Sequence, residues 1–541
     1  MDDQPTKKSW KDFLKKRGIV YAYAFAVLLL SIPLTPVLQF FFIVFSALCG
    51  FLFFRRFFRP EDIDAPMPSP PFLTEKRLAV ALLIPFAILI FTRVILFIRF
   101  SDYPPLGYDM GIYKYEFERA RDFYAALKTS FYPGLIILVS LLQKLGVSVA
   151  FLMREFYIAL NLLIGLMVYL TGREFFGKRA GFLAFVFYVA SITQFNAYYF
   201  FLYKNVLALS LLLGALILLH RRSLWAIATG VALGIVQPPD FLILALTLAM
   251  VFIIRFREKE ARRYLLITGG AIASLFLLAF LSRFNQIIEG INLILTNKQH
   301  WDPSISGGGV FISFSQYVEQ AIYYLPFFVI GYLGSFIWLK KKKLAPSIHY
   351  LHIGLLISLL IVVFKFIFYK RYIIELDIFV ILFASFGASI LWQWYCQRIW
   401  QKIVWIIAGV LILLNIMSES GQTFPLISQL EAARIGTLCY LPKNALIMVT
   451  DSFYSPWIRG YSCHEVIAPG LFELNRWDYE GWEKLWSGQK EQVEQKMEEL
   501  KAYRRSVYVF IGDFQPKMDF TGVKGFAKLR SYLWRWDFVR D

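Results

Sequence analysis

Residues 78–120, LAVALLIPFAILIFTRVILFIRFSDYPPLGYDMGIYKYEFERA, join a long apolar run to an acidic loop. The apolar run ends at Phe100 and is long enough for a helix to cross the hydrocarbon core of a bilayer, which takes about 20 residues. Asp102, Asp109 and Glu116 follow shortly after it. Carboxylates are costly next to hydrocarbon, so acids at this boundary suggest a functional role.

The composition of the whole chain extends this pattern. Of its 541 residues, 58% are hydrophobic and 18% are charged, which leaves too little polar surface for an ordinary soluble domain. We predict a mainly α fold, a polytopic bundle of transmembrane helices with a small extracytoplasmic α/β domain at its C-terminal end. Dividing the apolar runs at Pro, Gly and charged residues predicts about 13 spans, near residues 18–33, 36–54, 78–100, 153–171, 180–199, 203–220, 224–237, 240–256, 264–282, 322–339, 348–368, 372–392 and 403–419.

Membrane topology explains the net charge of +19. Nucleic-acid binders are also basic, but here the basic residues lie in short loops between apolar runs, where they set the orientation of the spans. We therefore expect no nucleic-acid partner. We expect an integral, multi-pass protein of the cell membrane, with an uncleaved first span, a cytoplasmic N-terminus and an extracytoplasmic C-terminal domain. Alternate loops carry Arg55, Arg56, Arg59, Lys76, Arg77, Arg173, Lys178, Arg179, Arg221, Arg222, Arg255, Arg257, Lys259, Arg262, Arg263, Lys340 to Lys343, Arg398 and Lys402.

The same patterns divide the chain into four regions. We expect a cytoplasmic tail over residues 1–17, a transmembrane hairpin with a Pro-rich cytoplasmic linker over 18–77, a transmembrane core with external catalytic loops over 78–419, and the extracytoplasmic α/β domain over 420–541. Within the core, PGLIILVSLLQKLG (133–146) is apolar but too short to cross a membrane. It is expected to lie along the outer interface.

In the C-terminal region the pattern becomes that of a water-soluble domain. ALIMVT (445–450) and VYVFIG (507–512) are typical of buried strands, and SGQKEQVEQKMEELKAYRRS (487–506) is typical of a helix. Strands that alternate with a helix favour at least partly parallel pairing. Cys439 and Cys463 both fall in this region, where they could form a disulfide or remain two buried, unpaired thiols. The buried stripe of the helix is predicted to consist of Val493, Met497 and Leu500.

Asp109 is the main candidate for chemistry in the acidic loop. The prolines at 104–105 resist helix formation, whereas a helix can begin after Asp109 with that residue as its N-cap. Helical spacing then places Tyr113 and Glu116 on the same face, and Asp102 could fold back toward them. Asp109 could act as a general base on a hydroxyl, or bind a divalent cation with Asp102 or Glu116. The alternative is that it only caps the helix.

A cationic counterpart occurs in KFIFYKRYIIELDIFVILF (365–383), where Lys370 and Arg371 lie between two apolar runs. On the outer side such cations break the positive-inside trend and need an anion nearby. Arginine presents a planar fork that matches phosphate oxygens, so Arg371 is expected to bind a lipid phosphate or pyrophosphate. An interfacial anchor, or an ion pair with Glu375 or Asp377, is the alternative.

Further polar residues stand at predicted outer ends of spans or in outer loops. Lys204, Gln237 and Asp240 could line a cavity or could cap helix ends. The loop 283–322 contains His300 within TNKQHWDPSISGGG, whose consecutive glycines suggest a substrate-gating lid, although such runs are also common in plain loops.

Four stretches carry a resemblance to a known family. They are the acidic loop GYDMGIYKY (107–115), the short apolar helix YPGLIILVSLLQKLG (132–146), YLTGREFFGKRAGFLAFVFYVAS (169–191) and KRYIIELDIFVILFASFGAS (370–389). Their order resembles the GT-C superfamily of polytopic membrane glycosyltransferases, with an architecture similar to protein mannosyltransferases and oligosaccharyltransferases. The resemblance covers roughly residues 78–420.

The resemblance implies an enzyme that moves a sugar, with inversion, from a polyprenyl phosphate or pyrophosphate donor to an acceptor glycan, lipid or protein. Asp109 matches the family's catalytic or metal-binding acid, Asp102 a second acid, and Arg371 the donor-phosphate cation. A divalent cation, Mg²⁺ or Mn²⁺ held by Asp109 and Asp102, is left open. The expected catalytic residues are Asp109, Asp102 and Glu116, and the expected substrate-binding residues are Arg371, Lys370, Lys204, Gln237, His300 and Tyr113.

Two other functions fit the same sequence. A transporter or flippase for lipid-linked sugars would bind headgroups with the same outer cations, although the chain shows no twofold repeat and its ionisable groups gather at the outer rim. A non-catalytic scaffold with GT-C architecture is the second alternative.

Overall fold

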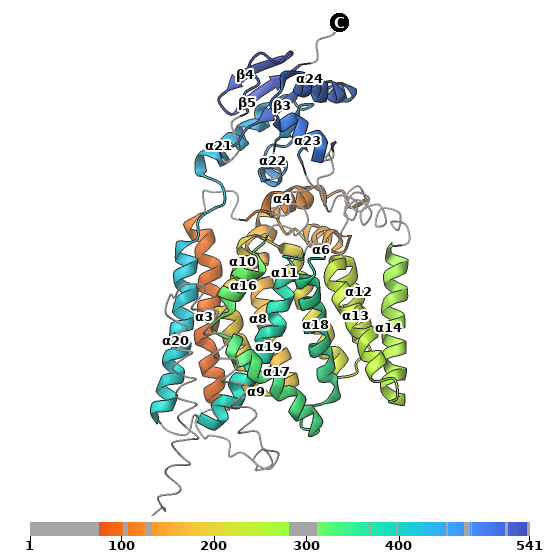
Figure 1. The fold of residues 1–541 in the computed structure, drawn as a ribbon, viewed down its shortest axis with the longest axis vertical. Helices are drawn as coiled ribbons and strands as arrows, with labels where there is room; N and C mark the ends of the chain where they lie inside the picture. The colour runs from red at the N-terminus through yellow and green to blue at the C-terminus, as the bar shows by residue number, and fades with distance from the viewer. Residues whose placement is uncertain are drawn as a thin grey trace, which may run out of the picture.

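The structure is a computed structural model that describes residues 75–100, 107–124, 133–280, 311–366, 369–395, 399–450, 453–469, 476–477, 479–513 and 518–537. Over these residues a bundle of long helices carries a small domain with a five-stranded sheet at one end (Figure 1). The predicted mainly α fold with a small α/β region near the C-terminus is therefore confirmed.

A helix is present at each predicted span from residue 78 onward. The spans predicted at 18–33 and 36–54 lie outside the described residues. Helices α13 (Pro238–Ile254) and α17 (Leu325–Lys340) each have a proline in the first turn, where its missing N–H leaves no helix bond unmade. The helices of the bundle and its connections are α3 (Glu75–Arg99), α4 (Met110–Arg119), α6 (Pro133–Lys144), α7 (Val149–Phe151), η2 (Leu152–Phe156), α8 (Tyr157–Phe176), α9 (Lys178–Ala190), α10 (Ile192–Tyr199), α11 (Tyr203–His220), α12 (Trp225–Val236), α13 (Pro238–Ile254), α14 (Lys259–Phe280), α16 (Phe314–Ala321), α17 (Leu325–Lys340), η6 (Pro346–Ile348), α18 (His349–Val363), α19 (Ile373–Tyr395) and α20 (Ile399–Gln422).

By length and composition, fewer helices than predicted qualify as membrane spans. Among the described residues, 6 helices are long and apolar enough to cross a bilayer, or up to 8 if each bent pair counts as one span. The span predicted at 180–199 is one such pair, because the chain bends by 54° between α9 and α10. Ser191 sits at this break and caps α10 by accepting a hydrogen bond from the Gln194 amide. The apolar helices and their lengths mark the chain as an integral membrane protein.

Helix α19 forms the centre of the bundle. Residues 373–391 of it are buried, and it packs against α8, α9, α17 and α18. An all-apolar helix can also face lipid, so the burial of α19 results from the four helices packed around it. The turn that precedes α19 is therefore held at a fixed position, and it carries Arg371.

The sheet domain follows α20. Its strands β1 (Leu446–Val449), β2 (Glu465–Ile467), β3 (Val507–Phe510), β4 (Phe526–Arg530) and β5 (Leu533–Trp536) are ordered β2-β1-β3-β5-β4. The β1 strand pairs in parallel with β2 and β3, and the β3-β5-β4 part is antiparallel. Around the sheet lie α21 (Gln429–Thr437), η7 (Leu438–Tyr440), α22 (Ser455–Tyr461), α23 (Tyr479–Trp486), α24 (Lys490–Glu499) and η8 (Leu500–Tyr503).

Most local predictions for this region are confirmed. The predicted strands at 445–450 and 507–512 are β1 and β3, and the partly parallel pairing is present. The predicted stripe of Val493, Met497 and Leu500 is buried against the sheet. Cys439 and Cys463 are exposed free thiols whose sulfur atoms lie 3.1 Å apart, so the expected burial of unpaired thiols is wrong.

The sheet domain rests on α4, the helix that follows Asp109 (Figure 1). The backbones of α4 and α22 touch at Gly111 and Gly460, where a Cβ on Gly111 would overlap the carbonyl oxygen of Pro456. Tyr108 packs edge-on against Trp457, with ring centroids 5.9 Å apart. The acidic loop is thus clamped between the bundle and the sheet domain.

Candidate active site

The loop around Asp109 is fixed by backbone contacts with the end of α10. The Asp109 amide donates to the carbonyl of Phe200 at 3.3 Å, and a Cβ on Gly107 would overlap the carbonyl oxygen of Tyr199. Asp109 is only 4% exposed. It stands at the N-cap position of α4, as predicted, but its side chain makes no capping hydrogen bond. The carboxylate is therefore available for a tertiary partner.

That partner is Arg371. Its Nη2 lies 3.2 Å from Oδ2 of Asp109, in an ion pair that joins residues 262 positions apart in the chain. The Asp109 side chain is 6% exposed and that of Arg371 is 21% exposed. The structure thus brings together the two residues that the sequence singled out as acid and cation. Asp377, one of the alternative partners, instead accepts hydrogen bonds from Ser191, Gln194 and Tyr324.

Lys204 and Glu116 complete a cluster of four charges. Lys204, at the start of α11, is half-buried, and Asp109, Glu116 and Arg371 all act on it electrostatically. Asp109, Glu116, Lys204 and Arg371 are called the Asp109 cluster below. Its two acids and two cations balance in charge, which lowers the cost of placing them at a partly buried position.

Tyr113 supports the cluster from α4. Its hydroxyl accepts a hydrogen bond from the Lys204 backbone amide at 3.2 Å, and its ring lies 5.8 Å from Nζ of Lys204. The ring also packs against Tyr203 and Phe117. Because both the ring and the hydroxyl of Tyr113 make contacts, Tyr113 restricts the position of Lys204.

A small cavity of about 30 Å³ adjoins the Asp109 cluster. Arg371 lines it together with the predicted residue Gln237. The other lining residues are Asn205, Pro239, Asp240, Tyr372 and Glu375. Among these, Asn205 was not predicted as a site residue, although its position directly after Lys204 in an apolar run was a usable signal.

The remaining predicted residues are less informative. Lys370 is half-buried in the turn beside Arg371. Asp102 and His300 lie outside the described residues.

A second buried cation was missed by the sequence analysis. Arg93 of α3 is completely buried, and its guanidinium lies 5.2 Å from the ring centroid of Phe195 and 5.0 Å from that of Tyr198. The signal was visible, because Arg93 interrupts the apolar run 78–100, and ionisable groups inside a span are costly.

Solved structures with the same arrangement were found by comparison of folds. The apo oligosaccharyltransferase of Archaeoglobus fulgidus matches with a TM-score of 0.57 at 13% identity, over 80% of this chain and 69% of that one. A complex of the same organism's oligosaccharyltransferase AglB with an inhibitory peptide and a dolichol-phosphate gives 0.54 at 13% identity, over 80% and 69%. ArnT from Cupriavidus metallidurans, bound to undecaprenyl phosphate, gives 0.51 at 10% identity, over 85% and 97%.

These matched proteins belong to the GT-C superfamily. The chain has the GT-C fold. The resemblance that the sequence suggested is thus confirmed at the level of the fold. No protein-family model matches the sequence, and no curated protein matches it.

The GT-C fold raises the question of a metal at Asp109, because another structure of the A. fulgidus oligosaccharyltransferase contains Zn and sulfate. Among the described residues, no group of three or more His, Cys, Asp or Glu side chains could hold a metal ion. Asp109 instead contacts one cation and lies near a second. The two acids of the Asp109 cluster are already balanced by two cations and are too few to form a ligand set, so the described part of the cluster does not fit a divalent ion.

Proposed function

We propose that this protein is a membrane glycosyltransferase that moves a sugar from a polyprenyl phosphate or pyrophosphate to an acceptor hydroxyl, with inversion. One observation carries the proposal: a buried acid and an arginine from distant parts of the chain meet beneath the sheet domain. The GT-C fold supports it, since similar structures were solved with dolichol-phosphate and undecaprenyl phosphate. The acceptor class, whether glycan, lipid or protein, stays a prediction.

The cations of the Asp109 cluster would hold the donor phosphate. Arg371 binds Asp109 through Nη2, and its planar guanidinium matches the geometry of phosphate oxygens. Lys204 would add a second positive charge from α11. A polyprenyl phosphate leaves readily once its charge is neutralised, so the cations replace the general acid that ordinary glycosidases need.

Asp109 would act as the general base. As the acceptor oxygen attacks the anomeric carbon, its proton passes to the Asp109 carboxylate. The bond between the anomeric carbon and the phosphate oxygen breaks, and its electron pair leaves with the polyprenyl phosphate. One displacement inverts the anomeric centre. Glu116 and Tyr113 position Lys204, and Gln237 lines the cavity beside Arg371.

The proposal also fixes an orientation. The bundle end that carries α4 and the sheet domain would face the extracytoplasmic side, and the basic loops at the other end would face the cytoplasm. We retain residues 78–419 as the core and 420–541 as the extracytoplasmic domain.

Purified protein in lipid nanodiscs, incubated with a panel of polyprenyl-linked sugars, tests the proposal. We expect transfer or slow hydrolysis of one donor, and a loss of roughly 100-fold or more in Asp109→Asn. Arg371→Gln should lose a similar factor, while Arg371→Lys should lose less because it keeps the charge. Asp122→Asn, an exposed acid near the end of α4, is the matched control.

Intact donors in every incubation would overturn the proposal, and a flippase would then be indicated by donor translocation in sealed vesicles. Full activity of a folded Asp109→Asn variant would overturn the assignment of the base alone.

A further inference from the structure

Four buried polar side chains line the cavity beside Arg371, and each has at least one oxygen atom for which the described part of the chain provides no hydrogen bond of normal geometry. They come from three helices: Asn205 from α11, Gln237 and Asp240 from the N-terminal end of α13, and Glu375 from α19. Each residue is at most 3% exposed. The atoms concerned are Oδ1 of Asn205, Oε1 of Gln237, Oδ2 of Asp240 and both carboxylate oxygens of Glu375.

Such a set is costly as it stands, because a buried acceptor without a donor loses its hydration and gains nothing in return. Asp377, two residues after Glu375 on the same helix, is a buried acid whose carboxylate is fully hydrogen-bonded within the protein. It accepts hydrogen bonds from Ser191 at 2.8 Å, from Gln194 at 2.9 Å and from Tyr324. Asp240 and Glu375 therefore differ in kind from Asp377.

The size and chemistry of the cavity restrict its occupant. At about 30 Å³ it admits a single ion or one to two waters, and it is too small for a sugar ring. The five unpartnered atoms of these four side chains are all oxygen acceptors, and two of the side chains are carboxylates that lie close enough to interact with each other. Carboxylate and amide oxygens together are the ligands that hard divalent cations prefer.

We propose that Asn205, Gln237, Asp240 and Glu375 form a binding site for one divalent cation of the Mg²⁺ class. The two positive charges of the bound cation would neutralise the Asp240 and Glu375 carboxylates. The amide oxygens of Asn205 and Gln237 bring the number of protein ligands to four, and water would fill the remaining coordination positions. Arg371 lines the same cavity, but none of the four ligands belongs to the metal position that the sequence suggested at Asp109 and Asp102. It does not depend on the proposed transfer reaction.

Mn²⁺ binding to the purified full-length protein tests this site without any sugar donor. Free aqueous Mn²⁺ gives a sharp six-line electron paramagnetic resonance spectrum that is lost on binding, so titration gives stoichiometry and affinity. We expect one Mn²⁺ per chain that Mg²⁺ displaces, and a loss of roughly tenfold or more in affinity for Asp240→Asn and for Glu375→Gln. Asn205→Ala, which removes a neutral ligand, should weaken binding less and serves if an acid variant fails to fold.

Asp377→Asn and Asp109→Asn are the matched controls. Both remove a buried acid near the site, and both should retain the wild-type affinity for Mn²⁺. The proposal is overturned if the wild-type protein binds no Mn²⁺, which would mean that Asp240 and Glu375 share a proton instead. It is also overturned if Asp109→Asn abolishes Mn²⁺ binding while Asp240→Asn and Glu375→Gln retain it. Loss of donor turnover with retained Mn²⁺ binding would reject the proposed function alone.

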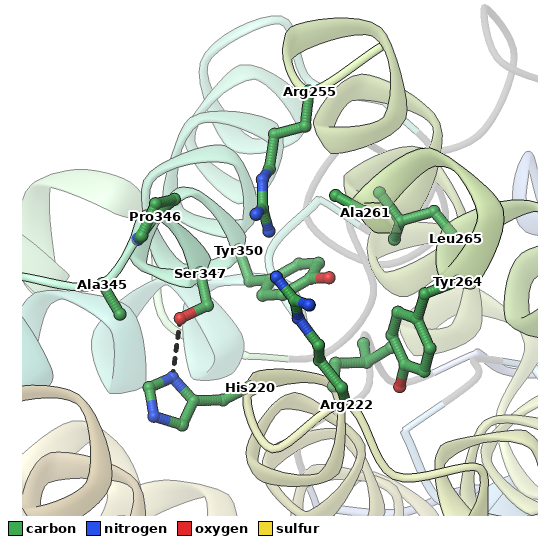
Figure 2. Close-up of a pocket in the computed structure, with 11 residues that line it drawn as sticks. His220, Arg222, Arg255, Ala261, Tyr264, Leu265, Ala345, Pro346, Ser347 and Tyr350 are labelled. Atoms are coloured by element: carbon green, nitrogen blue, oxygen red, sulfur yellow. Dashed lines mark hydrogen bonds between the residues drawn. The ribbon is translucent and has the colours of Figure 1, made fainter. Parts of the chain in front are cut away.

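A second, larger pocket of about 150 Å³ lies at the opposite end of the bundle from α4. Figure 2 shows the guanidinium groups of Arg222 and Arg255 directed into it, with Tyr264 and Tyr350 beside them. His220 and Ser347, joined by a 2.7 Å hydrogen bond, close one side (Figure 2). The pocket is formed by helix ends, which is the depth at which phospholipid headgroups lie.

Each arginine keeps donors for a ligand. Arg255 binds Glu258 through Nε and Nη2, and Arg222 binds Glu260 through Nη1. A guanidinium has five N–H donors, so several remain. The loops around the pocket are strongly basic. We infer that this pocket binds the phosphodiester headgroup of an anionic phospholipid, with the two arginines as its clamp.

Thermal unfolding in nanodiscs of phosphatidylglycerol or phosphatidylcholine tests the headgroup site. We expect a higher unfolding midpoint in phosphatidylglycerol, and loss of this difference in the double variant Arg222→Gln with Arg255→Gln. Arg221→Gln is the matched control, because Arg221 is adjacent, exposed and paired with Glu174 but does not line the pocket. An unchanged difference in the double variant, or equal stabilisation by inorganic phosphate in phosphatidylcholine, would reject the lipid site.

Discussion

Removing either member of the Asp109–Arg371 pair should destabilise the protein more than removing both. In Arg371→Gln the Asp109 carboxylate, whose side chain is 6% exposed, keeps its charge but loses its bonded cation. Breaking a buried pair from one side costs roughly 3–5 kcal/mol. Because the Arg371 side chain is 21% exposed and Lys204 also acts on Asp109, we expect about 2–3 kcal/mol.

A double-mutant cycle isolates the contact itself. Asp109→Asn, Arg371→Gln and the double variant are compared with wild type by unfolding in mixed detergent micelles, which needs neither donor nor acceptor. We expect a coupling free energy of at least about 2 kcal/mol, because the double variant leaves no unpaired charge and should cost less than either single variant. The exposed pair of Glu498 and Lys501 in the sheet domain is the control, with an expected coupling of about 0.3–0.5 kcal/mol.

The result that would refute this reasoning is additivity. If the two single effects sum to that of the double variant within roughly 0.5 kcal/mol, the side chains do not interact, and the acid and cation do not share a site.

Further predictions concern the sheet domain and the bundle core. Gly111→Ala forces α4 away from Pro456 and should lower the free energy of unfolding by roughly 1–3 kcal/mol. The control is Gly436→Ala in α21, which has open space around it and should be neutral or stabilising by up to about 1 kcal/mol. Equal melting temperatures for the two variants would contradict the α4–α22 contact. Although Cys439 is exposed as a residue, partial desolvation of its sulfur and the Cys463 sulfur 3.1 Å away raise the pKa of the Cys439 thiol to about 11. Its alkylation rate, followed by mass spectrometry, should therefore keep rising above pH 9, where an ordinary thiol with a pKa near 8.5 levels off. A plateau by pH 9 would show the shift to be absent. Arg93→Met replaces a buried guanidinium by an apolar side chain of similar length and should leave stability unchanged or raise it by about 1 kcal/mol; a clear drop in melting temperature would show that the cation is needed.

The sequence was sufficient for the elements whose pattern is local. Apolar runs located a helix at each described span, and alternating strands and the stripe of Val493, Met497 and Leu500 gave the parallel part of the sheet domain. The number of full spans was less predictable. The 54° bend at Ser191 arises from a hydrogen-bonded cap that local hydropathy does not register, and it divides one apolar run into two helices.

Within the candidate site, the sequence predicted which residues are important more reliably than it predicted what their side chains bind. Asp109 stands where an N-cap is expected, and its sequence neighbours favour that role, yet its carboxylate binds Arg371. The capping role was replaced because α10 and the sheet domain fix the loop, which leaves the carboxylate free to neutralise a cation from another helix. Asn205 was overlooked for a similar reason, since only the meeting of α11, α13 and α19 gives it a polar environment.

The sequence alone determined that this chain is a polytopic membrane protein with an acid and a cation at helix ends, because hydrophobicity and charge act on each segment separately. Only the tertiary structure decided which of those charges meet. Burial makes an unpaired charge costly, so the packing around α19 selects the Asp109 and Arg371 pairing. The same packing gathers Asn205, Gln237, Asp240 and Glu375 around the cavity that Arg371 lines.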